Sequence, residues 1–507
     1  MRFEFAYELA SEWPPLAWIA VCERGSPLLR IVAGDGVEQR QNWFCEAVWD
    51  APFSDGNFDQ TDVVFGSGAR LRENQVIFVS AGSTVDRLQF AIRGKRTVVS
   101  NSLACLMETI EESLSPGSKG YCKFFEAIEQ GIDCPLHALP CVGGPVQLAY
   151  YTNLKWDGSR LQTVSKPTTP RDFARFHGYT GFMRSVLRRI AENMSSAERA
   201  ISYSWLGTIS RGYDSAACSV LARSAGLREV ITHDQSRPGE NDDGTGIAEA
   251  LGLKCIQVNR LAWKDGTLLE PLFLAADAQG KEIMIAGAGR TLNRKVLITG
   301  HGGDTAWSIH AQPGNNLARI THSGLSMTEY RLHSGFIHLP LPFIGLGQLT
   351  DLVQLSRSPE MKPWDIGGTY NRPICRRLIE EAGVRRDAFG IAKTGASIRF
   401  LRGEDSWSVK GRATFFEWLK IHRSVYQIHL TSLVQGWICF LLLGFALRFS
   451  QRGPTLIRRA CHRLGRFFAH HIRRRGLNDL AFIWAAETVA DFYCGDRIRQ
   501  KAPDQQC

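Results

Sequence analysis

The sequence has no low-complexity tract, no internal repeat and no Cys-x-x-Cys pair. These absences exclude a repeat architecture and leave no metal-ligand spacing among the thirteen cysteines. Their odd count disfavours a complete disulfide framework, so we expect free, mostly buried thiols in a reducing compartment. The first nine residues show no basic-then-apolar pattern. We therefore expect no secretory signal and a cytoplasmic protein.

A second absence concerns nucleotide binding. No Gly-x4-Gly-Lys-Ser/Thr motif occurs, which excludes that major phosphate loop. The composition is otherwise typical of a globular protein, with 44% apolar and 22% charged residues. A chain of 507 residues is too long for one hydrophobic core, so we expect two or three domains.

Three regions differ in pattern. Residues 1–165 contain short β-rich runs between Gly, Asp and Asn, which predict a β-rich domain, and the polar stretch 165–171 is the predicted linker. Residues 166–405 begin with a predicted helix at about 172–195 and then alternate strand and helix, the pattern of a parallel sheet. Residues 406–507 are predicted to be a helical extension. The predicted fold class is α/β, preceded by a β-rich domain.

The strongest motif follows the first strand of the alternating region. An apolar run at 203–209 predicts a buried parallel strand, and Ser210-Arg-Gly-Tyr-Asp-Ser215 follows it before a predicted helix. A helix N-terminus offers free N–H groups and a positive dipole end to a phosphate. Gly212 would let the backbone approach phosphates, Ser210 and Ser215 would donate to them, and Asp214 suits a Mg²⁺ ion bridging to pyrophosphate. An ordinary strand–helix turn capped by Ser or Asp is the alternative.

This loop resembles the pyrophosphate loop, Ser-Gly-Gly-x-Asp-Ser, of the N-type ATP pyrophosphatases, with Arg211 in place of a glycine. Farther on, Val296-Leu-Ile-Thr-Gly-His-Gly-Gly-Asp304 resembles an element of asparagine synthetases, and more closely that of lasso-peptide cyclases. The resemblance implies a PP-loop (adenine-nucleotide α-hydrolase-like) synthetase domain behind a β-rich, glutaminase-like (Ntn-hydrolase-like) domain. It also implies ATP and Mg²⁺ as cofactors. The residues expected around the nucleotide and pyrophosphate are Thr208, Ser210, Arg211, Gly212, Asp214, Ser215, Thr299 and Gly300.

Three further side chains have expected roles. Asp304 supplies a second carboxylate, able to hold Mg²⁺ opposite Asp214 or to bind the incoming amine. His301 stands where many asparagine synthetases have a glutamate, and it is either the general base for the amine or a structural histidine. The resemblance implies that Lys393, within the small-residue loop 389–397, contacts the phosphates; a surface lysine is the alternative.

The N-terminal region bears on the nitrogen source. Glutamine-dependent members of the family expose a nucleophilic cysteine at the N-terminus, whereas this sequence begins Met1-Arg2. Segments 84–107 and 139–148 still resemble closing parts of that domain. We therefore expect a degenerate glutaminase domain that does not hydrolyse glutamine by itself. The amine would be free ammonia, the product of a separate ammonia source, or an amine on the substrate, as in β-lactam synthetases.

Two adjacent segments characterise the C-terminal extension. Residues 430–447 contain no charge over eighteen residues, and eight arginines, three histidines and no acid lie between Arg452 and Arg475. The first segment meets the minimum length of a spanning helix, and a buried helix is the alternative. Together they predict peripheral contact with an anionic membrane and no nucleic-acid partner; a solvated arginine face is the alternative. A final amphipathic helix is predicted at 477–493.

These features predict an AMP-forming, ATP-dependent amide ligase that adenylates a small-molecule, sugar or peptide carboxylate and joins an amine to it. A tRNA-modifying enzyme of the same superfamily is one alternative; it suits the basic tail but lacks a thiolation Cys-x-x-Cys. A non-catalytic nucleotide-binding scaffold is the other, and it leaves both carboxylates and Lys393 without a role.

Overall fold

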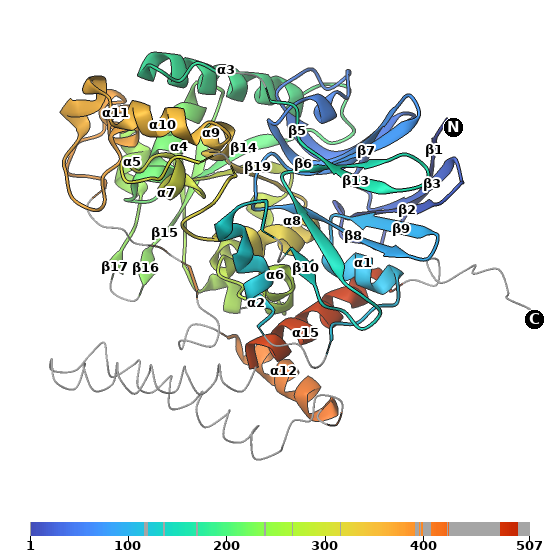
Figure 1. Ribbon diagram of the computed structural model, residues 1–507. Coiled ribbons are helices and arrows are strands. Elements are labelled where there is room, and N and C mark those ends of the chain that lie inside the picture. The colour runs from blue at the N-terminus through green and yellow to red at the C-terminus, as the bar shows by residue number, and fades with distance from the viewer. Residues whose placement is uncertain are drawn as a thin grey trace, which may run out of the picture.

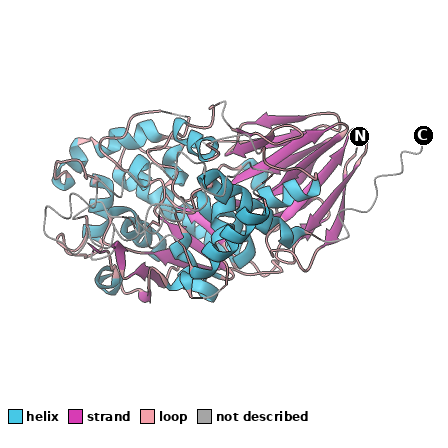
Figure 2. Cartoon of the chain, turned by 90° about the horizontal axis from the view of Figure 1, so that it is seen from below, coloured by secondary structure: helices cyan, strands magenta, loops and turns pink. Residues whose placement is uncertain are grey.

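A computed structural model describes residues 2–115, 120–134, 137–168, 171–237, 240–265, 267–314, 316–390, 395, 397–398, 407–422, 424 and 477–494. Lys393, the apolar segment 430–447 and the arginine-rich block 452–475 lie outside these ranges. Strands gather at the end of the molecule that holds the N-terminus, and helices dominate the other end (Figures 1 and 2). The structure confirms a mixed α/β fold with a large β-rich N-terminal region and a separate parallel sheet.

Two sheets build the N-terminal region, in the strand orders β1-β3-β2-β9-β8-β11-β10 and β13-β12-β7-β6-β5-β4. Neighbouring strands are antiparallel except β1 and β3, which pair in parallel. The strands are β1 (Glu4–Leu9), β2 (Trp18–Glu23), β3 (Leu28–Ala33), β4 (Glu38–Arg40), β5 (Trp43–Trp49), β6 (Val64–Arg72), β7 (Gln75–Val79), β8 (Arg87–Arg93), β9 (Arg96–Ser100), β10 (Ala138–Leu139), β11 (Val146–Tyr150), β12 (Asn153–Trp156) and β13 (Leu161–Val164).

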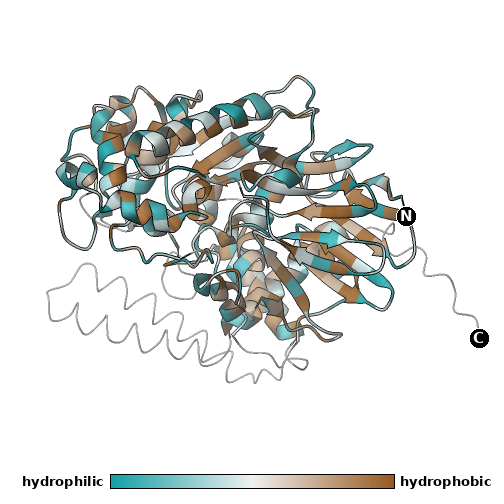
Figure 3. Ribbon diagram, turned by 45° about the horizontal axis from the view of Figure 1, so that its top comes forward, coloured by the Kyte–Doolittle hydropathy of each residue, from teal (hydrophilic) through white to brown (hydrophobic). Residues whose placement is uncertain are grey.

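Alternating side chains give these sheets two buried faces. Trp18 of β2 points between the sheets, where it contacts Phe44 of β5 and stacks at 6.4 Å on Phe78 of β7. Its neighbour Ile19 points the other way, into the core around helix α1 (Leu103–Thr109). Successive residues of a strand face opposite sides of the sheet. Strands such as β2, with apolar residues at consecutive positions, are therefore buried on both faces. In Figure 3 these strands are largely brown, the colour of hydrophobic residues.

The second region is built on a five-stranded sheet in which every neighbouring pair is parallel, in the order β18-β15-β14-β19-β20. Its strands are β14 (Ser204–Thr208), β15 (Glu229–His233), β18 (Lys254–Val258), β19 (Lys295–Thr299) and β20 (Ile337–Pro340). In chain order they run third, second, first, fourth and fifth, so the winding direction reverses between β14 and β19. Open sheets of this kind bind ligands at that reversal, beyond the carboxyl ends of the strands.

Helices flank both regions, and a two-stranded ribbon extends from β15. The remaining α-helices are α2 (Cys122–Glu126), α3 (Phe176–Met194), α4 (Tyr213–Arg223), α5 (Thr245–Ala250), α6 (Glu270–Asp277), α7 (Gly303–Ala306), α8 (Thr328–Ser334), α9 (Phe343–Leu346), α10 (Leu349–Ser356), α11 (Pro373–Glu381), α12 (Val409–Ile421) and α15 (Leu477–Ala490). The ribbon is β16 (Gln235–Arg237) and β17 (Glu240–Asn241), and the 3₁₀ helices are η1 (Phe58–Gln60), η2 (Ala127–Gln130), η3 (Ala262–Lys264), η4 (Ile283–Leu292), η5 (Leu325–Met327), η6 (Pro359–Trp364) and η8 (Asp491–Tyr493).

Lys166, near the start of the predicted linker, is buried, and its ammonium donates to Ser80 O at 2.6 Å and to Asn153 Oδ1 at 2.7 Å. One local prediction needs correction. Helix α15 is not amphipathic, since residues 481–486 are all buried. It packs between α6 of the second region and α1 of the first, so it needs apolar side chains all round (Figure 1).

A buried ion-pair cluster joins the two regions. Arg331 of α8 binds Glu46 of β5 with Nη1 at 2.7 Å from Oε2, and its Nε lies 3.0 Å from Asp86 Oδ1. All three residues are buried. Charges taken out of water need such partners, so separation of the regions would leave them uncompensated.

Two further observations concern the whole described chain. Its ten cysteines form no disulfide, as the sequence predicted for them. Within the described ranges, none of the helices combines the length and hydropathy that a membrane span requires.

Candidate active site

Two loops from distant parts of the chain meet where the winding of the parallel sheet reverses. The first joins β14 to α4 and contains Ser210–Ser215; the second joins β19 to α7 and contains Gly300–Asp304. Strands β14 and β19 are direct neighbours, with Gly207 opposite Ile298. Both loops therefore leave the same edge of the sheet at adjacent positions.

Glycines allow these loops to touch. A Cβ atom on Gly300 would lie 2.6 Å from Asp214 Cβ and 2.9 Å from the Ser215 nitrogen. A Cβ atom on Gly303 would lie 2.6 Å from Asp214 Cγ. Real carbon atoms do not approach so closely, so both positions require glycine while the loops keep this spacing. The two motifs thus form one packed unit around Asp214.

A cavity of about 300 Å³ opens at this junction. Its polar lining includes Ser210, Asp214, Ser215, Asp304 and Arg372. Its apolar lining comes from Ile209, Ile231, Met284, Ile285 and Met327. A mostly apolar pocket with a few convergent polar groups is typical of a small-molecule or cofactor site.

The structure brings together nine of the eleven residues predicted for the site. The lining contains Thr208, Ser210, Gly212, Asp214, Ser215, Thr299, Gly300, His301 and Asp304. Arg211 is not among the lining residues, and its carbonyl accepts a hydrogen bond from Gly390 N at 2.8 Å. Lys393 lies outside the described residues, although Gly395 and Ser397 of the same loop line the cavity.

Side chains organise the start of α4. The Ser210 and Ser215 hydroxyls lie 3.1 Å apart, and Ser210 Oγ accepts from Gly212 N at 3.2 Å. Tyr370 accepts a 3.3 Å hydrogen bond from Tyr213 N through its hydroxyl, and the two tyrosine rings are 4.9 Å apart. These contacts fix the loop next to a helix end whose N–H groups lack intrahelical acceptors.

Arg372 is the main residue that sequence reasoning missed. Its guanidinium forms an ion pair with Asp214, the predicted metal ligand, and lies 5.2 Å from the Tyr370 ring centroid. Burial lowers the pKa of Arg372 to about 10, so the side chain stays charged at neutral pH. It lies directly before α11 and outside both sequence motifs.

His301 is hydrogen-bonded to a buried group behind the cavity. Its Nδ1 lies 3.0 Å from Thr299 Oγ1, and the same hydroxyl lies 2.8 Å from His338 Nε2 of β20. Burial is the largest cause lowering the pKa of His301, nearby Arg319 adds to it, and Glu282 and Asp304 oppose it. His301 is therefore neutral at pH 7 and has one bare ring nitrogen that could accept a proton.

Metal binding at this site would depend on the ligand. Among the described residues, no group of three or more His, Cys, Asp or Glu side chains could hold a metal ion. Asp214 and Asp304 both line the cavity, and Mg²⁺ is commonly held by one or two carboxylates together with substrate phosphates. Such a site is complete only with the nucleotide in place, and Arg372 would have to share or release Asp214.

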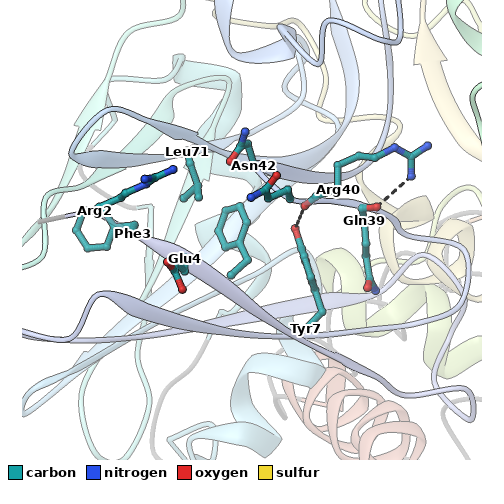
Figure 4. A pocket seen from close by; sticks show the side chains of 10 residues that line it. Arg2, Phe3, Glu4, Tyr7, Gln39, Arg40, Asn42 and Leu71 are labelled. Atoms are coloured by element: carbon teal, nitrogen blue, oxygen red, sulfur yellow. Dashed lines mark hydrogen bonds between the residues drawn. The ribbon is translucent and has the colours of Figure 1, made fainter.

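A second cavity, of about 570 Å³, opens at the edge of the N-terminal sheets (Figure 4). Most of its lining residues belong to β1 and its N-terminal neighbours or to β4 and the β4–β5 turn. Tyr7, one of them, donates to Arg40 O at 2.7 Å. None of its ten lining residues is Cys, Ser or Thr. This cavity therefore holds no hydroxyl or thiol nucleophile on a lining residue, apart from the Tyr7 phenol.

The site was compared with known proteins. A scan of protein-family models finds no match to this chain, and a search of curated protein sequences finds no significant match.

Proposed function

We propose that the cavity binds ATP and that the chain is an AMP-forming amide ligase of the asparagine synthetase type. One observation carries the proposal: Ser210–Ser215 and Gly300–Asp304 pack against each other at the reversal point of a parallel sheet and line one cavity. Nucleotides bind at such reversal points. The resemblance of both loops to the pyrophosphate-binding and substrate elements of that family supports the same conclusion.

Each wall of the cavity suits one part of the nucleotide. The apolar side chains of Ile231, Met284 and Ile285 suit the base. The start of α4 and the Ser210 and Ser215 hydroxyls suit the phosphates. The Arg372 guanidinium adds a fixed positive charge beside Asp214.

The residues fit Mg²⁺ held together with the nucleotide. Asp214 and Asp304 would be its protein ligands, with phosphate oxygens completing the set. When bound, the ion would neutralise charge on the pyrophosphate.

The proposed reaction has two steps. In the first, a carboxylate oxygen of the substrate attacks the α-phosphorus of ATP, and the bond to the bridging oxygen breaks to release pyrophosphate. In the second, an amine attacks the acyl carbon, the bond to AMP breaks, and a proton of the amine passes to His301. The neutral state of His301 supports this role. Lys393 is proposed to contact the phosphates and to stabilise the negative charge that builds on the departing pyrophosphate.

A non-catalytic nucleotide-binding scaffold is the second candidate. The ion pair of Arg372 with Asp214 favours it, because a guanidinium already neutralises the predicted metal ligand. The two candidates differ in whether Mg²⁺ strengthens ATP binding and in whether ATP turns over.

The test uses the purified full-length chain. Calorimetric titration with ATP should show binding that Mg²⁺ strengthens, and Asp214→Ala should lose the Mg²⁺ effect. Asp35→Ala, at an exposed aspartate of the N-terminal region, is the matched control and should behave as the wild type. With a pool of carboxylates and amines, ATP labelled at the α-phosphate should yield AMP.

Three outcomes would decide between the candidates. ADP as the product would contradict the proposal. ATP binding without a Mg²⁺ effect and without turnover would select the scaffold. Absence of ATP binding would reject both.

A further inference from the structure

Three polar side chains form a line from the cavity into the interior. His301 lies at the cavity, Thr299 is the last residue of β19, and His338 lies on the neighbouring strand β20. Leu297 pairs with His338 across the two strands, so residue 299 lies on the same face as His338, one repeat farther along. His338 is 1% exposed and Thr299 is 4% exposed, so water has little access to these two side chains.

The single hydroxyl proton couples the two rings. Thr299 Oγ1 lies 2.8 Å from His338 Nε2 and 3.0 Å from His301 Nδ1, but it can donate only one hydrogen bond. Burial lowers the pKa of His338 well below its ordinary range and also lowers that of His301, so both rings are neutral. A neutral imidazole has one N–H and one bare nitrogen. If the hydroxyl donates to His338, it must accept from His301 Nδ1–H, which leaves His301 Nε2 bare.

The opposite arrangement would disable the base. If His338 Nε2–H donated to Thr299, the hydroxyl proton would go to His301 Nδ1, and His301 Nε2 would carry the other proton. Nε2 is the only ring nitrogen of His301 left for a ligand, because Nδ1 is held by Thr299. Only the first arrangement therefore offers a proton acceptor to the cavity.

We propose that His338 is a positioning residue that, through the Thr299 hydroxyl, holds His301 in the tautomer with a bare Nε2 facing the cavity. The choice of this tautomer rests on the proposed function, which needs a base in the cavity, whereas the coupling of the two rings through Thr299 rests on the geometry alone. Wrong-tautomer variants of a catalytic histidine in other enzymes lose about 10⁴-fold in kcat, which shows how much such a hydrogen bond can govern.

The direct test is nitrogen-15 NMR of histidine-labelled full-length protein, with the His301 signals assigned by their loss in His301→Gln. In the wild type, His301 should show a protonated Nδ1 and a bare Nε2. In His338→Phe and in Thr299→Val this single tautomer should give way to a mixture. His333→Phe is the matched control, because His333 is exposed on α8 and already contacts Phe492, and it should leave the His301 signals unchanged.

The outcomes separate this inference from the proposed function. A wild-type His301 with protonated Nε2, or an unchanged tautomer in both variants, would overturn the inference even if the protein makes amides. Thr299→Val keeps the test decisive if His338→Phe does not fold. If amide formation is observed, His338→Phe should slow amine capture at least about 10-fold while ATP–pyrophosphate exchange stays within about 2-fold, because only the second step needs the base. Equal losses in both steps would reduce His338 to a structural role.

Discussion

Replacing Gly300 by alanine tests the packing of the two loops most directly. The new Cβ atom would lie 2.6 Å from Asp214 Cβ and 2.9 Å from both Asp214 C and Ser215 N. Carbon atoms in favourable contact are about 3.5–4.0 Å apart. Two of the three neighbours are backbone atoms and cannot rotate away, so the loops must separate by about 1 Å.

The magnitude follows from that displacement. Overpacking of this kind costs about 1–3 kcal/mol. Alanine restricts the unfolded chain and returns about 0.4–1 kcal/mol where its backbone conformation is allowed, so the net loss is smaller than the packing cost. For a region of about 150–250 residues, each kcal/mol corresponds to about 2–4 °C in Tm. We expect a Tm lower by a few degrees and, because Asp214 and Ser215 move, ATP binding weakened at least about 10-fold.

Gly246→Ala is the matched control. Gly246 is exposed on α5, and a Cβ atom there meets nothing within 4 Å. Alanine should stabilise that helix by about 0.5–1 kcal/mol and leave ATP binding unchanged. The assay is thermal unfolding followed by calorimetric titration of each variant with ATP. A Gly300→Ala protein with wild-type Tm and wild-type ATP affinity would refute the described contact between the loops.

Three further predictions use other parts of the molecule. Burial raises the pKa of Asp277 to about 6, so the folded state loses stability as pH rises from about 4 through 6 and this carboxyl ionises. Asp277→Asn should therefore have a higher Tm than the wild type at pH 8 and the same Tm near pH 4. An equal gain in Tm at both pH values would contradict the assignment. Arg331→Met leaves Glu46 and Asp86 buried without their cation and should lower the free energy of unfolding by about 3–5 kcal/mol, seen as a lower Tm. A wild-type Tm would show that the cluster does not join the regions. Lys393→Met should raise the barrier to adenylation by about 2.7–4 kcal/mol and change ATP affinity little. The rate of ATP–pyrophosphate exchange measures the first effect, and a normal rate would make Lys393 a surface lysine.

The parallel sheet could be predicted because strand and helix patterns alternate over this part of the sequence. The run at 203–209 becomes β14, and the segment ending at Thr299 becomes β19. Two motifs that each follow a predicted strand must then lie at one sheet edge, which is why most of the expected residues line one cavity. The position of each motif after a predicted strand, together with the resemblance of both motifs to a known family, predicted that much without any knowledge of strand order.

Other parts of the site could not be predicted from local pattern. Arg372 follows no strand of the parallel sheet and belongs to neither motif. It immediately precedes α11, and its importance comes from tertiary packing that places its guanidinium against Asp214. The prediction of an amphipathic α15 was wrong because polar side chains in this helix do not mark a solvent-exposed face. The helix is enclosed between α1 and α6. Asp479 of that helix is itself held by the N–H groups of Gly120 and Tyr121, both at 2.8 Å. Polar residues on a helix do not mark its exposed face when loops supply hydrogen-bond partners.

Thr299 shows how the sequence motif and the structure each contribute to understanding one residue of the site. Its place at the end of β19 indicated a contact with the nucleotide, and it does line the cavity. Its hydroxyl, however, is already engaged by His301 and His338, so a nucleotide could use this residue only through other atoms or by breaking that line. A hydroxyl with one proton and two imidazole partners has no second proton to donate to a phosphate. The motif therefore locates the residue at the site, but the register of β20 beside β19 determines what its side chain does there.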